Sequence, residues 1–171
     1  MTRLSTQRLV LSHLSDEDAP FIVELLNDPD WIRYIGDRNV RTPEDARQYL
    51  RNGPMAMYAR EGFGLYRTAL SRDDTPIGLC GLIRRPALAD VDIGFAFLPA
   101  YRGLGYALES AGAVLDEARS LGLPRVVAIV SPENARSAAL LTRLAFVRER
   151  SIRLSEDDEL LDLYACELRA P

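Results

Sequence analysis

The stretch Asp90-Val-Asp-Ile-Gly-Phe-Ala-Phe-Leu-Pro-Ala-Tyr-Arg-Gly-Leu-Gly-Tyr-Ala107 changes its periodicity halfway along. Bulky residues alternate with small or polar ones up to Leu98, which predicts a strand with one bulky face and one nearly bare face. Pro99 cannot donate to a sheet ladder and therefore ends this strand. From Tyr106 to Leu121 apolar residues recur at helical spacing, and Gly122 suits the position just past a helix end. The predicted order is strand, glycine-containing loop, helix.

The predicted loop has the composition of an anion site. Gly103 and Gly105 allow the backbone to take positive φ angles or to approach a ligand closely. A helix that begins in such a loop presents unpaired N–H groups and the positive end of its dipole. Arg102 adds a planar guanidinium suited to phosphate oxygens. The sequence therefore predicts a ligand that carries phosphate.

Two familiar nucleotide motifs fit this loop poorly. The dinucleotide fingerprint needs glycine or alanine where Leu108 stands, and a P-loop needs a lysine, a residue that this chain lacks. The remaining pattern, Arg102-x-x-Gly105-x-Ala107, resembles the Gln/Arg-x-x-Gly-x-Gly/Ala motif of the GNAT superfamily of N-acetyltransferases. In that superfamily the motif binds the pyrophosphate of acetyl-CoA.

Other segments extend the resemblance to the ribosomal-protein N-terminal (RimJ/RimL-like) acetyltransferase branch, from about Thr6 to Phe146. The matching phrases are Thr6-Gln-Arg-Leu-Val-Leu11, Asp92-Ile-Gly-Phe95, Tyr101 to Glu109, Asn134-x-x-Ser137 and Arg143-Leu-Ala-Phe146. Ala145 stands where the branch has glycine, so the geometry of that turn is open.

The elements and the resemblance together predict an α/β fold, a single domain over residues 1–171. Its central sheet is expected to be mixed and mostly antiparallel, with about seven strands and about four helices on both faces. Strands are expected at 4–14, 63–70, 76–83, 91–98, 125–130, from 145, and at 160–168. Helices are expected to begin at Ser15, Thr42, Tyr106 and Ser131; Asp28-Pro29 and Gly53-Pro54 are expected to end the first two, and residues 31–36 to form an irregular connection.

Composition narrows the class of protein. With 171 residues, 47% hydrophobic and 27% charged, the chain suits one globular domain. No apolar run approaches the ~20 residues that span a bilayer, and the N-terminus lacks a signal-peptide core, so a cytoplasmic protein is expected. The net charge of −4 argues for a cationic co-substrate and against nucleic-acid binding. The oligomeric state stays open, a homodimer included.

Cys80 and Cys166 lie in apolar segments without nearby metal-ligand partners, so two buried thiols are expected, with no disulfide and no metal. His13, the lone histidine, follows a predicted strand and is interpreted as structural.

The resemblance implies that acetyl-CoA is the donor co-substrate. It further implies that the strand at 91–98 parts from the next one, so that backbone groups near Phe95 to Phe97 bind the pantetheine arm and polarise the thioester carbonyl. The residues implied to bind the donor are Phe95, Ala96, Phe97, Arg102, Gly103, Leu104, Gly105, Tyr106, Ala107, Asn134 and Ser137.

The bare strand face holds the candidate general base. Asp92 shares this face with Gly94 and Ala96, and its alternative role is to pair with an arginine and orient the acceptor. Many GNAT enzymes carry a tyrosine acid where this chain has Leu141, which leaves Ser137 to protonate or solvate the leaving thiolate. Glu109 forms either a surface or a tertiary ion pair.

An amine-bearing small molecule or peptide N-terminus is the expected acceptor. Trp31 and Tyr34, with Asp92, are candidates for its pocket, although the two aromatic rings could equally pack the connection onto the sheet. Two other functions remain open: a non-catalytic CoA-binding regulatory or sensing module, and a nucleotide-binding protein of another fold.

Overall fold

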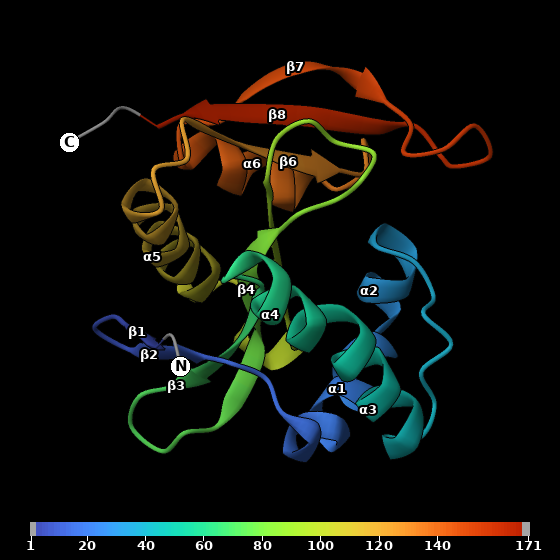
Figure 1. The fold of residues 1–171 in the computed structure, drawn as a ribbon, viewed down its shortest axis with the longest axis vertical. Coiled ribbons are helices and arrows are strands. Elements are labelled where there is room, and N and C mark those ends of the chain that lie inside the picture. Colours follow the sequence, from blue (N-terminus) through green and yellow to red (C-terminus); the bar gives the residue numbers. More distant parts are fainter. Residues whose placement is uncertain (1–2, 169–171) are drawn as a thin grey trace.

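A computed structural model describes residues 3–168. One sheet runs through the molecule in the order β1-β2-β3-β4-β5-β6-β8-β7, with helices on both faces (Figure 1). The strands are β1 (Arg3–Ser5), β2 (Leu9–Ser12), β3 (Leu65–Leu70), β4 (Pro76–Ile83), β5 (Asp92–Phe97), β6 (Arg125–Val130), β7 (Val147–Ile152) and β8 (Leu161–Glu167). The α-helices are α1 (Ala19–Leu26), α2 (Pro29–Tyr34), α3 (Pro43–Leu50), α4 (Ala56–Glu61), α5 (Tyr106–Ser120) and α6 (Ala135–Arg143). The predicted mixed α/β fold is confirmed.

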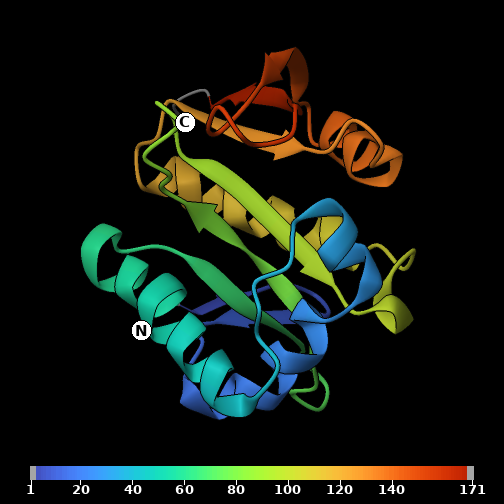
Figure 2. The same ribbon diagram turned by 90° about the vertical axis from the view of Figure 1, so that its right-hand side faces the viewer.

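The pairing of β5 with β6 divides the sheet. All other neighbouring strands are antiparallel, whereas β5 and β6 are parallel and are joined by the α5 crossover that parallel strands need. The β5–β6 register contains a single pair, Asp92 with Val127. Beyond this pair the strands separate, and Figure 2 shows β6, β8 and β7 standing apart from the β1–β5 part.

Two apolar cores hold the helices on the sheet. One core packs α5 against the sheet, with Ala111, Val114 and Leu115 buried beside Ile93 and Phe97 of β5. The other core covers the opposite face with α1, α2 and α3, and its larger members are Ile22, Leu25, Leu26, Trp31, Leu50 and Leu79. The bulky face of β5 therefore packs in the core under α5, and its bare face is directed towards the core under α1, α2 and α3.

The first predicted strand, 4–14, is wrong as a single strand. Thr6 turns the chain there: its N–H donates to the Leu9 carbonyl at 2.9 Å, and its hydroxyl accepts from the Leu9 N–H at 3.0 Å. A side chain that bonds its own backbone in this way competes with an extended conformation. Residues 3–12 therefore form the β1–β2 hairpin, and the described sheet has eight strands, not seven.

Gly53-Pro54 does not end the second helix. A π-helical turn over Arg51–Met55 contains Pro54 and continues into α4, which ends at Gly62 with φ +78°. Proline lacks the N–H of a normal helical turn, and a widened turn tolerates it. The prediction treated Pro54 as a stop when it is a local irregularity.

Two other helix starts differ from expectation. Residues 31–36 were predicted to be irregular, yet 31–34 belong to α2, because the Asp28 carboxylate accepts from the Trp31 N–H at 3.2 Å and Pro29 occupies the first turn. Helix α6 is capped by Asn134 and not by Ser131. Asp28 and Asn134 are both residue types that commonly cap helices. The sequence did not decide between Asn134 and the nearby Ser131.

Ala145 keeps the turn that glycine forms in the resembling branch. Its φ is +66°, and the Ala145 and Phe146 N–H groups bond the carbonyls of Thr142 and Leu141 at 3.1 and 2.9 Å. This bonding is the Schellman pattern of a helix C-terminus. The open turn geometry is thus resolved, with an alanine in a left-handed conformation.

We expect Ala145→Gly to stabilise the protein by roughly 0.5–1 kcal/mol. The substitution removes the cost of about 1–2 kcal/mol for a left-handed alanine, and the greater freedom of glycine in the unfolded chain offsets only part of this gain. Urea unfolding measures the change. Ala113→Gly, in the middle of α5, is the matched control and should destabilise by about 1 kcal/mol. Equal destabilisation by both variants would contradict the assigned turn.

Candidate active site

The loop between β5 and α5 presents a row of free N–H groups. Gly103 and Gly105 take φ values of +73° and +84°, as their positions predicted. Within residues 3–168, the N–H groups from Gly103 to Leu108 donate to no other residue. Because α5 begins at Tyr106, the positive end of its dipole adds to these donors. The loop has the arrangement that a diphosphate requires, and its binding role stays a prediction.

The Arg102 guanidinium does not face this loop. Its Nε donates to the Phe97 carbonyl at 3.0 Å, Nη1 to the Asp30 carboxylate at 2.8 Å, and Nη2 to Asp28. Two carboxylates and a carbonyl thus occupy the fork that was expected to meet phosphate. Arg102 instead ties the end of β5 to α2, and the expectation of a phosphate-facing guanidinium is corrected.

Arg8 braces the loop from the other side. Its Nη1 donates to the Leu104 carbonyl at 3.0 Å, and its guanidinium carbon lies 4.4 Å from the centre of the Tyr106 ring. Its Nε and backbone N–H both donate to Glu109, at 2.7 and 2.8 Å. Arg8 therefore fixes the loop and places positive charge beside Gly105.

Glu109 is a tertiary ion-pair partner, one of the two roles left open for it. Burial opposes its ionisation, but hydrogen bonds from Thr6 and Arg8 hold its pKa below the ordinary value. The carboxylate thereby joins the β1–β2 turn to the first turn of α5.

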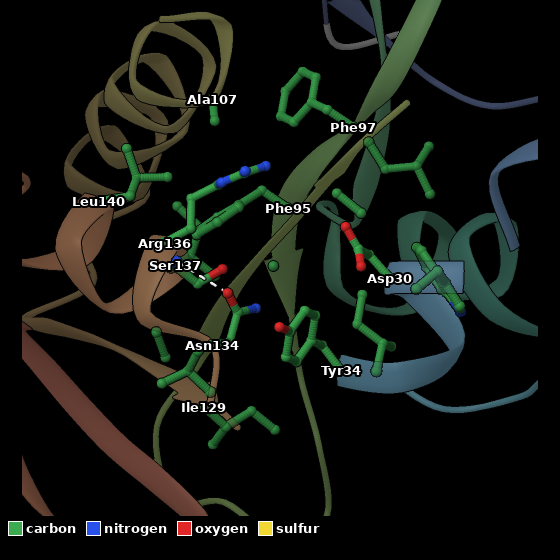
Figure 3. A pocket seen from close by; sticks show the side chains of 18 of the residues that line it. Asp30, Tyr34, Phe95, Phe97, Ala107, Ile129, Asn134, Arg136, Ser137 and Leu140 are labelled. Atoms are coloured by element: carbon green, nitrogen blue, oxygen red, sulfur yellow. Dashed lines mark hydrogen bonds between the residues drawn. The ribbon is translucent and has the colours of Figure 1, made fainter. Parts of the chain in front are cut away.

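Arg136 is a cation of the site that the sequence interpretation missed. Figure 3 shows its side chain reaching from α6 across the gap towards Ala107. Within the described part of the chain it makes no ion pair or hydrogen bond. A usable signal existed, because Arg136 lies four residues before Leu140 and so shares its helix face. Arg136 thus lines the cleft as a cation without a partner in residues 3–168.

The separation of β5 from β6 leaves main-chain groups without a strand partner. The Val127 N–H bonds the Val91 carbonyl at 2.9 Å, so the backbone groups of odd-numbered β5 residues point towards β6. Beyond the single pair, those of Phe95 and the N–H of Phe97 face the gap. Ala96 pairs with Leu79 of β4 instead. The parting implied by the resemblance is present, and Ala96 lines the cleft by its side chain.

Asp92 lies at the closed end of this gap, on the bare face of β5. Its side chain is 1% exposed, and Arg85 Nε donates to both carboxylate oxygens at 3.1 and 3.2 Å. Burial raises the pKa of Asp92 to about 6, against the lowering effect of Arg85. The predicted pairing of Asp92 with an arginine is therefore present. Despite this pairing, the pKa of the carboxylate is close to neutrality.

The α6 side of the gap carries two predicted polar residues. The Asn134 Oδ1 accepts from the Ser137 N–H at 3.2 Å, which leaves the Asn134 amide nitrogen free to donate (Figure 3). The Ser137 hydroxyl has no partner within residues 3–168 and lines the cleft. Figure 3 shows Tyr34 of α2 opposite, with its hydroxyl directed towards Asn134.

The packing interpretation of Trp31 is confirmed, and its role in an acceptor pocket stays a prediction. Trp31 is 5% exposed and packs in the core beneath α1 and α3, yet it also borders the cleft. Its indole N–H is buried and has no acceptor in the described structure.

Most of these residues bound one cleft of about 1070 Å³, whereas Arg8, Leu104 and Glu109 lie outside its lining. It runs from the Gly103–Leu108 loop, between β5 and α6, to the space enclosed by α2, α3 and α4. Pockets for one small molecule usually measure 300–1,000 Å³, so this cleft has room for two reactants.

Two kinds of feature are absent from residues 3–168. No helix there is long and apolar enough to cross a membrane, and no three metal-ligating side chains are grouped to hold an ion. Cys80 and Cys166 are buried free thiols, as predicted.

Comparison with known proteins agrees with this geometry. Residues 8–147 match the family described as Acetyltransferase (GNAT) domain. The uncharacterized N-acetyltransferase YoaA of Bacillus subtilis (strain 168) is 30% identical over 155 residues, covering 88% of this chain and 85% of the relative. YnaD of the same organism, also an uncharacterized N-acetyltransferase, is 26% identical over 85% of this chain and 83% of its own.

Solved structures share the fold. An acetyltransferase from Agrobacterium tumefaciens str. C58 superposes with a TM-score of 0.83 at 25% identity, over 98% of this chain and 95% of the other. The ribosomal-protein acetyltransferase RimL, solved in complex with coenzyme A, gives a TM-score of 0.85 at 18% identity, over 99% of this chain and 100% of the other. The latter likeness is one of fold.

We expect Arg136→Ala to weaken acetyl-CoA binding by about tenfold or more, because a charge-assisted hydrogen bond contributes about 1.5–3 kcal/mol. Isothermal titration of the full chain measures the dissociation constant. Arg72→Ala, in the exposed β3–β4 turn, is the matched control and should leave it unchanged. Equal affinities of all three proteins would remove Arg136 from the donor site.

Proposed function

Because this chain belongs to the acetyltransferase (GNAT) domain family, we propose that it transfers the acetyl group of acetyl-CoA to a primary amine by direct attack in a ternary complex. The observation that carries the proposal is the gap between β5 and β6, which opens beneath the free N–H groups of Gly103–Leu108. A diphosphate at the loop and a thiol-bearing arm in the gap would direct the thioester towards Asp92.

The main chain of β5 supplies the electrostatic part of the reaction. Phe95 and Phe97 direct N–H groups into the gap, where the thioester carbonyl would lie. As the amine nitrogen attacks, the carbon–nitrogen bond forms, the carbon–sulfur bond breaks and negative charge develops on the carbonyl oxygen. Donors already fixed in a strand stabilise this charge without reorganising.

Asp92 accepts the proton that the attacking amine loses. A lysine-like amine with pKa ~10.4 costs about 4–5 kcal/mol to be neutral at pH 7, whereas an α-amine near 7.8 costs only about 1 kcal/mol. A buried carboxylate with a pKa of about 6 is ionised at pH 7 and is a stronger base than an exposed aspartate. Asp92 thus matters most for acceptors with a high pKa.

Ser137 and Asn134 serve the other end of the reaction. The Ser137 hydroxyl lines the gap and can donate a hydrogen bond to the departing thiolate, which takes its proton from solvent. The Asn134 amide nitrogen is placed to donate to an amide carbonyl of the pantetheine arm. Trp31 and Tyr34 border the space left for the acceptor.

The test is CoA release from acetyl-CoA with a panel of amines, amino acids and peptides with free amino termini. We expect turnover with at least one acceptor and no acetylated enzyme during the reaction, as direct attack requires. Binding of acetyl-CoA without turnover on any acceptor would instead support a non-catalytic CoA-binding module.

Asp92→Asn should lower kcat/KM by roughly 100-fold or more, the usual contribution of a general base, while acetyl-CoA affinity is retained. For the wild type, kcat/KM should rise with pH through about 6, because the catalytic form of Asp92 is the ionised one. The variant should lose this inflection and keep only that of the amine.

Asp90→Asn is the matched control, since Asp90 lies two residues earlier and pairs with Arg125 outside the cleft. An unchanged pH inflection in Asp92→Asn would assign the base to another group.

A further inference from the structure

Arg85 has donors that its ion pair does not use. Only Nε bonds Asp92, and within the described chain neither Nη1 nor Nη2 has a partner. The side chain is 29% exposed and lines the cleft. Asp92 thus holds the inner edge of the guanidinium, and the outer fork is free to meet a ligand.

Arg38 and Tyr49 line the same part of the cleft from other elements. Arg38 lies in the connection between α2 and α3, and Tyr49 in the last turn of α3. Neither side chain has a hydrogen bond or ion pair within residues 3–168. Burial raises the pKa of Tyr49, whereas the positive charges of Arg38 and Arg85 lower it, so the hydroxyl lies within electrostatic reach of both.

The acceptor half of the cleft is electrically polarised. On the α2 side, Asp28 and Asp30 share the single guanidinium of Arg102, which leaves one net negative charge. On the other side, Arg85 pairs with Asp92, and Arg38 lines the cleft without an ion-pair partner in residues 3–168, which leaves one net positive charge. A molecule with an ammonium group and an anionic group matches both sides.

A free arginine at a surface is ordinary, because water satisfies its donors. Arg38 alone would therefore carry no argument. Arg85 and Tyr49 differ, since both are partly buried within the cleft and polar groups in such places normally have partners. Two guanidinium groups and a phenol hydroxyl that line one part of a cleft from separate elements, with donors left over, suit an oxyanion.

We propose that Arg38, Tyr49 and Arg85 form a carboxylate subsite, so that the acceptor carries a carboxylate in addition to its reactive amine. The inference rests on the proposed function, of which it names the substrate class. The carboxylate could be the α-carboxylate of a free amino acid or the acidic side chain at a peptide amino terminus. Trp31, Met57 and Ile83 supply apolar walls for the body of the molecule.

Product-like ligands test the subsite without relying on turnover. The full chain, saturated with CoA, is titrated with the N-acetyl derivatives of phenylalanine, leucine and methionine, and with their carboxamides. A second arm compares N-acetyl-aspartyl with N-acetyl-asparaginyl peptide amides. We expect at least one carboxylate ligand to bind about tenfold or more tightly than its neutral partner, and the arm in which this occurs identifies the source.

Arg38→Gln and Tyr49→Phe should each reduce this preference, and Arg38→Lys should keep part of it because the charge remains. Arg41→Gln is the matched control: Arg41 lies in the same connection but pairs with Asp37 away from the cleft. With the preferred acceptor, Arg38→Gln should raise KM more than it lowers kcat. Unchanged unfolding temperatures would exclude a merely structural effect.

The outcomes separate the two proposals. No preference for carboxylates in either arm, or a preference that survives in Arg38→Gln, would overturn the subsite. A carboxylate preference in an enzyme that turns over no amine would leave the subsite standing and reject the proposed catalysis. Acetylation of amines that lack a carboxylate, with a kcat/KM equal to that of carboxylate-bearing amines, would reject the subsite and leave the proposed catalysis standing.

Discussion

The parting of β5 from β6 is the constraint on which the other features depend. The strands share one residue pair, Asp92 with Val127, and beyond it the backbone N–H and C=O groups of Phe95 have no partner on β6. Backbone N–H and C=O groups buried without partners are costly, so a folded chain keeps such a gap only where something else satisfies them. The α5 crossover then ends the gap with the free N–H groups of Gly103–Leu108. An open strand edge that leads to a helix N-terminus is a site for an extended ligand with an anionic head.

Arginine pairs hold this arrangement in place from both sides. Arg102 connects the end of β5 to Asp28 and Asp30, and Arg8 connects the loop to Glu109 and to the β1–β2 turn. Each guanidinium also bonds a backbone carbonyl, Phe97 or Leu104, so the loop is fixed at both ends. Donors fixed before a ligand arrives do not lose their freedom on binding, which favours affinity. Arg8 and Arg102 are thus structural here, whereas Arg136 lines the cleft without a partner in residues 3–168.

Features that are set by residues close together in the sequence could be predicted, whereas features that depend on distant contacts could not. The strand, the positive φ of Gly105 and the α5 boundaries follow from alternation, glycine and helical spacing, all readable within a few residues. The direction of the Arg102 side chain was predicted wrongly, because its partners Asp28 and Asp30 lie more than 70 positions away. Arg136 was missed for the same reason: its significance comes from the gap it crosses. Pairing across a fold is set by tertiary packing, which periodicity does not report.

Hydrogen–deuterium exchange of the backbone, with and without CoA, tests the central claim most directly. The account predicts that CoA slows exchange at the amides from Gly103 to Leu108 and at Phe95 and Phe97, and leaves the β7–β8 edge unchanged, because bound oxygens replace water as acceptors of those N–H groups. If CoA bound while exchange in the loop and along β5 stayed the same, the gap would not be the donor site, and the proposed transfer at Asp92 would lose its basis.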